Sequence, residues 1–70
     1  MTYRFTIDMD RERDGRWIAE VTGLPGVLAY GSTRSEALSA AEALALRVVA
    51  ERLERGEVPP DSLEVSFAVS

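Results

Sequence analysis

The residues of this chain that could carry chemistry are its carboxylates, because the sequence has 12 acidic residues and neither histidine nor cysteine. Clustered carboxylates can hold the paired metal ions of ribonuclease-H-like nucleases. The one combination of this kind is Asp8 on a first strand with Glu36 or Glu42 from a helix. Against it, strand alternation places Asp8 on the same face as Arg4 and Thr6, and the last strand ends without an aspartate. We therefore expect no catalytic residue, no metal site and no cofactor.

Other catalytic classes lack their essential partners. A serine or threonine nucleophile would need a histidine or lysine base, and the sequence contains neither residue type. The glycines at 23, 26 and 31 do not have the spacing of a phosphate-binding loop or of a dinucleotide fingerprint. We expect that this protein is not an enzyme.

The charge of the chain favours a basic protein partner. The 70 residues carry 8 basic side chains, all arginine, and a net charge of −4. An acidic domain does not gain affinity for a phosphate backbone through counterion release, so direct nucleic-acid binding is not expected. It can be steered electrostatically onto a basic protein. Arginine without lysine, asparagine or glutamine fits a GC-rich or heat-adapted source.

The small size of the chain favours self-association. A domain of this length buries only about 60% of the surface that its unfolded chain exposes. Without disulfides or metals, stability must come from packing or from oligomerisation. We expect a homo-oligomer, a dimer or larger.

Alternating apolar residues predict four strands, and a long amphipathic stretch predicts one helix. The expected strands are residues 2–9, 16–21, 27–30 and 63–70, and the expected helix is Arg34 to Arg55. The pair Asp14-Gly15 favours a hairpin turn between the first two strands.

Local turn chemistry marks the boundaries of the third strand and of the helix. Pro25 and Gly26 suit the second and third positions of a type II turn. Thr33 and Glu36 have the spacing of a capping box, in which the Glu36 carboxylate would accept from the N–H of Thr33. Gly56 is in the place where a helix ends.

These elements predict an α+β fold of order βββαβ, formed by residues 1–70 as a single domain without a separate DNA-binding domain. The first three strands form an antiparallel meander, and a right-handed helical crossover returns the last strand parallel to the first. The expected sheet order is 3-2-1-4, with the helix on one face. The other face remains uncovered and includes Arg4, Thr6, Ile18 and Ser66. Whether Leu28 and Tyr30 join it stays open, because the glycine-rich turn could shift the register.

Nothing in the sequence indicates export or membrane insertion. The first ten residues alternate polar and apolar side chains and contain no continuous apolar segment of the kind found in signal peptides. The helical stretch is interrupted by charges and is not expected to span a bilayer. The expected location is the cytoplasm.

A hairpin followed by Leu24-Pro25-Gly26, Gly31, Thr33 and Glu36-Ala37, opening an alanine-rich helix, resembles the HicB-like antitoxin family. The resemblance covers about residues 3 to 60. It implies a partial ribonuclease-H-like fold, in agreement with the topology above. It also implies a function, because HicB-type antitoxins bind and neutralise small basic HicA toxins that cleave RNA. Members of the family often carry an added DNA-binding domain, for which this sequence has no room.

The candidate contact residues for such a partner are the acidic hairpin and the apolar side chains of the sheet. They are Asp10, Glu12, Asp14, Ile18, Leu28 and Tyr30. The alternative function is an orphan homo-oligomeric module without a toxin, held together through an edge strand or the exposed side of the helix. Trp17, the only tryptophan, is expected in the core rather than at an interface.

Overall fold

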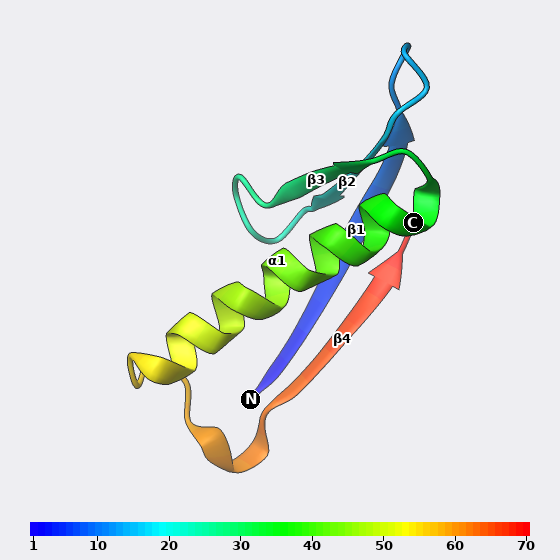
Figure 1. The fold of residues 1–70 in the computed structure, drawn as a ribbon. Helices are drawn as coiled ribbons and strands as arrows, with labels where there is room; N and C mark the ends of the chain where they lie inside the picture. The colour runs from blue at the N-terminus through cyan, green and yellow to red at the C-terminus, as the bar shows by residue number, and fades with distance from the viewer.

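The computed structural model describes residues 1–70, apart from the side chain of Pro60 (Figure 1). Its elements follow the predicted order with small shifts in their bounds. They are β1 (Thr2–Arg11), β2 (Trp17–Val21), β3 (Leu28–Gly31), α1 (Arg34–Glu54), the 3-10 turn η1 (Pro60–Ser62) and β4 (Glu64–Val69). The first strand is two residues longer than predicted, because Asp10 and Arg11 still pair across the hairpin with Ile18 and Trp17.

The strands form one four-stranded mixed sheet in the order β3-β2-β1-β4, which confirms the predicted topology. The pairs β1–β2 and β2–β3 are antiparallel, whereas β4 runs parallel to β1. Helix α1, which follows β3 and precedes β4 in the chain, packs across one face of this sheet (Figure 1). The tip of the β1–β2 hairpin extends beyond the rest of the sheet.

The register of β3 resolves which face carries its side chains. Ile18 lies opposite Tyr30, and Ala19 lies opposite Ala29. Ala19 is fully buried beneath the helix, so Ile18 and Tyr30 belong to the opposite, uncovered face. Leu28, two residues before Tyr30, lies on that same face, because side chains alternate along a strand.

The core lies between α1 and the covered face of the sheet. On the helix it is made mainly of small side chains, since Ala37, Ala41 and Ala45 are fully buried. Helix α1 contacts β3 and β2 much more than β1. The strands contribute larger side chains, of which Ile7 and Val21 are the largest that are fully buried. Trp17 is half-buried on this face and packs against the core, as predicted.

The turn before β3 has the predicted geometry. Gly26 has φ of 79°, and the N–H of Val27 donates to the carbonyl of Leu24 at 3.1 Å, as in a type II turn. The N–H of Val21 donates to the carbonyl of Val27 at 2.9 Å. This bond fixes where β3 begins to pair with β2.

The ends of α1 are capped by the predicted residues, with one correction. The hydroxyl of Thr33 accepts from the N–H of Glu36 at 3.1 Å. The Glu36 carboxylate accepts from the N–H of Ser32 at 3.0 Å, and the prediction that it would accept from Thr33 is wrong. Because Thr33 has an extended backbone, the N–H of the preceding residue, Ser32, is the one that the Glu36 carboxylate can reach. At the other end, Gly56 adopts φ of 74° and ends the helix.

Gly31 allows the first turn of α1 to lie close to the end of β3. A Cβ atom added there would lie 2.5 Å from the backbone nitrogen of Ala37 and 2.9 Å from Cβ of Glu36. Backbone cannot yield to such a contact without moving the helix. The glycine before the capping threonine is therefore required by packing rather than by an unusual backbone angle.

The part of the chain that the structure describes contains no helix with both the length and the apolar character needed to cross a bilayer.

We predict that Gly31→Ala destabilises the protein, because the added methyl group forces α1 away from β3. The expected loss in the free energy of unfolding is about 1–3 kcal/mol, which would lower Tm by about 4–8 °C per kcal/mol in a domain of this size. Gly23→Ala is the matched control, since a Cβ atom there meets no described atom within 4 Å. Thermal unfolding followed by circular dichroism measures both variants, and equal Tm values would contradict the packing argument.

Candidate protein-interaction surface

The uncovered face of the sheet brings acidic and apolar side chains together in two rows that cross three strands. One row is Asp10, Ile18 and Tyr30, and the next is Asp8, Glu20 and Leu28. We call these six residues the open-face patch. Within each row, neighbouring strands hold opposed side chains about 4.5–5.5 Å apart. The patch is therefore one continuous surface built on regular strands.

The acidic part of the patch contains a pair of like charges. Asp8 and Glu20 lie directly opposite each other on β1 and β2, and both are exposed. Like charges in this position destabilise a sheet. Among the described residues, neither carboxylate forms an ion pair, although the hydroxyl of Ser70 donates to Asp8. This pair places uncompensated negative charge near the centre of the uncovered face.

The apolar part of the patch lies beside these acids. Tyr30 is 46% exposed, and Ile18 and Leu28 are half-buried although no helix covers them. The guanidinium of Arg16 stacks over the ring of Tyr30, with Cζ 4.6 Å from the ring centre. Tyrosine and arginine are enriched among the residues that dominate the binding energy of protein interfaces, whereas peripheral charges mainly set orientation and association rate.

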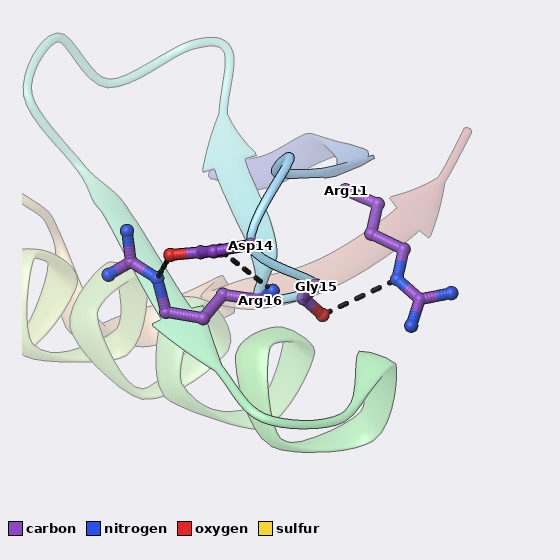
Figure 2. Close-up of polar contacts among 4 residues, drawn as sticks. All are labelled: Arg11, Asp14, Gly15 and Arg16. Carbon is purple, nitrogen blue, oxygen red and sulfur yellow. Dashed lines mark hydrogen bonds and ion pairs between the residues drawn. The ribbon is translucent and has the colours of Figure 1, made fainter.

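The hairpin tip uses most of its polar groups internally (Figure 2). Asp14 accepts from the N–H of Arg16 at 3.0 Å and from its guanidinium at 2.8 Å. The guanidinium of Arg11 donates to the carbonyl of Gly15 at 3.3 Å. The N–H of Glu12 donates to the carbonyl of Arg16 at 2.7 Å. The side chain of Glu12 is exposed. These contacts connect the two sides of the loop.

The six residues expected from the sequence therefore lie in two places. The structure brings Asp10, Ile18, Leu28 and Tyr30 together in the open-face patch. It places Glu12 and Asp14 at the hairpin tip, where the charge of Asp14 is balanced by Arg16.

Sequence reasoning did not include Asp8 and Glu20 among the contact residues. The alternation of β1 and β2 already placed both on the uncovered face. That the two face each other depends on the hairpin register, in which Met9 opposes Ala19 and Asp8 opposes Glu20.

The carboxylates considered for metal binding do not converge. Asp8 points away from α1, since its neighbour Ile7 is fully buried beneath the helix. Glu36 and Glu42 belong to the helix, on the other side of the sheet. Among the described residues, no group of three or more acidic side chains is close enough to hold a metal ion.

We predict that Asp14 titrates below the value of 3.8 that is ordinary for aspartate. Its pKa is lowered mainly because the carboxylate accepts the backbone N–H of Arg16, with the Arg16 guanidinium adding to the effect. Because the pKa of Asp14 is lower in the folded state than in the unfolded state, the ionised carboxylate stabilises the fold at pH values above the unfolded pKa. This stabilisation is lost as the pH falls through the lower pKa of the folded state.

Carboxyl chemical shifts measured by NMR against pH test this prediction. Arg16→Ala should keep part of the lowering, because the backbone donor, the largest single cause, remains in the variant. A midpoint at or above 3.8 in the unaltered protein would contradict the assigned hydrogen bonds.

Comparison with known proteins finds no match to a family model, to a curated protein or to a solved structure. The chemistry of the open-face patch and the order of the sequence motifs are therefore what bear on function.

Proposed function

We propose that this chain is a HicB-like antitoxin domain that binds and neutralises a small basic toxin of the RNA-cleaving HicA type. The observation that carries the proposal is the open-face patch, in which the acids Asp8 and Glu20, without ion-pair partners, lie beside the exposed ring of Tyr30 and the half-buried side chains of Ile18 and Leu28. The order of motifs from Leu24-Pro25-Gly26 to Glu36-Ala37 supports the family resemblance. On this proposal the domain acts in the cytoplasm and has no catalytic activity of its own.

The patch suits a basic partner for a physical reason. In the free domain, the repulsion between Asp8 and Glu20 costs free energy, and a cationic side chain between them would remove that cost. Arginine or lysine of a toxin that normally faces RNA phosphates can bind carboxylates instead. Leu28 and Tyr30 would be covered at the same time, which supplies the apolar contribution to affinity. Neutralisation would follow because the toxin surface that binds RNA is occupied.

Co-expression with the product of a neighbouring small basic open reading frame tests the proposal. The expected results are recovery of growth and co-purification of the two proteins. Absence of a complex together with absence of growth recovery would refute the antitoxin function and would favour the orphan module.

We predict that Asp8→Asn with Glu20→Gln slows association with the basic partner by about threefold to tenfold at low salt, because steering by the patch is lost. The fold itself should not be weakened, since the substitutions remove a like-charge contact.

The matched control is Glu51→Gln with Glu54→Gln, which removes the same charge from exposed positions of α1. Stopped-flow measurements of the association rate at several salt concentrations compare the two variants. An equal slowing by both pairs, or a rate that does not change with salt, would contradict the role of the patch.

A further inference from the structure

The outer edge of β4 carries backbone groups without a partner strand. β4 is the last strand in the sheet order, and its neighbour on the inner side is β1. The N–H of Glu64 donates to Met1 and that of Ser70 donates to Ile7, both at 3.0 Å. Because a parallel ladder has a two-residue period, the amides of Val65, Phe67 and Val69 point away from β1. These three residues present a row of N–H and C=O groups at the free edge.

The side chains of the same three residues are apolar and only partly covered. They lie on the face of the sheet that carries α1, since they pair in register with Tyr3, Phe5 and Ile7. Val65 and Phe67 are half-buried and pack against the core, and Val69 is 40% exposed. The thin cover follows from the position of α1, which contacts β3 and β2 and hardly reaches β4.

The edge has few of the features that natural proteins use to prevent pairing. Exposed edges are usually interrupted by lysine, proline or a bulge, or are very short. β4 has no lysine, proline or bulge, its one charged residue is Glu64 at its start, and it pairs with β1 over six consecutive positions. The opposite edge, β3, is shorter with four residues and ends in Gly31. A regular, unpaired edge with a row of apolar side chains is a site where another strand can add.

The surface area of the chain agrees with a missing neighbour. The accessible surface is 4713 Å², whereas a monomeric protein of 7.7 kDa is expected to expose about 4,300 Å². The excess of about 400 Å² is half of the roughly 800 Å² that each partner contributes to a standard interface. The projecting tip of the β1–β2 hairpin contributes to this excess together with the free β4 edge, and pairing along β4 would reduce it.

We propose that β4 pairs antiparallel with β4 of a second copy of this chain, with Phe67 opposite Phe67 at the two-fold axis. In this register Val65 lies opposite Val69 of the other copy, and all three outward residues form hydrogen-bonded pairs. The arrangement is self-complementary, as an isologous dimer requires. On the uncovered face Ser66 lies opposite Ala68 and Glu64 lies opposite Ser70, so no two charged side chains lie directly opposite each other. The product is a continuous eight-stranded sheet with both helices on one face.

Sedimentation velocity over a range of concentrations, together with amide hydrogen exchange, tests the proposal. The expected result is a dimer at micromolar concentration whose Val65, Phe67 and Val69 amides exchange slowly. A monomer at every concentration, or a dimer in which these amides exchange as fast as exposed ones, would overturn the proposal. Neither measurement involves a toxin, so its failure is distinct from failure of the antitoxin function.

Val69→Lys should raise the dissociation constant of the dimer at least about tenfold, because it places a charge in the apolar row at the edge. Ala50→Lys is the matched control on the exposed outer side of α1 and should leave the dimer unchanged. Circular dichroism verifies that both variants are folded. Equal dissociation constants for the two variants would locate the interface elsewhere and overturn the proposal.

Introduced cysteines identify the register, because the natural sequence contains none. Residues 66 and 68 are exposed, and in the proposed dimer they form a non-hydrogen-bonded pair with Cα atoms about 4.5 Å apart, within the range of a disulfide. A mixture of Ser66→Cys and Ala68→Cys chains, oxidised with glutathione disulfide, should form the mixed dimer faster than either chain cross-links with itself. Faster self-linking of one variant would indicate a shifted register and would contradict the pairing at Phe67.

Discussion

The contact between α1 and the β2–β3 half of the sheet is the interaction on which the rest of the structure depends. Ala37, Ala41 and Ala45 are fully buried on the helix, and Ala19 is fully buried beneath them. Small side chains permit a short distance between helix and sheet, and the absence of a side chain at Gly31 extends this contact to the first helical turn. Because the helix is held over β2 and β3, it cannot also cover β4.

A single helix cannot bury both faces and both edges of four strands, so the chain leaves two kinds of surface without a partner. The uncovered face is polar at β4 and at the start of β1, where Arg4 and Thr6 meet Ser66 and Ala68. It becomes acidic and apolar where β1 meets β2 and β3. The outer edge of β4 instead presents backbone N–H and C=O groups without a partner strand. The open-face patch suits a partner of opposite charge. The β4 edge suits any regular strand, and a second copy of this chain can supply one.

Much of the fold could be predicted from local signals. Alternation located the strands within one or two residues, and the capping threonine and the terminal glycine located α1. The strand order followed from short connections and crossover handedness, which do not depend on detailed packing.

Features that depend on loop geometry could not be predicted in the same way. The face that carries Leu28 and Tyr30 is set by the bond from Val21 to Val27 across a turn, whose exact register is not visible in residue types. The acceptor for the Ser32 amide likewise depends on how the chain enters α1. The pairing of Asp8 with Glu20 required the exact hairpin register, although each residue was already on the correct face. Local sequence thus determines the elements, and the turns determine which side chains meet.

Binding of a basic partner and dimerisation are compatible, because they involve opposite ends of the sheet. The open-face patch spans β1, β2 and β3, and pairing through β4 adds strands only at the other edge. In the resulting eight-stranded sheet, β2 of one copy is five strand spacings from β2 of the other, about 24 Å at 4.8 Å per spacing. Both patches then lie on the same face of the sheet, since the two-fold axis is perpendicular to it. A dimer would therefore present two acidic surfaces to two basic partners at once, and binding of one partner would not require the dimer to open.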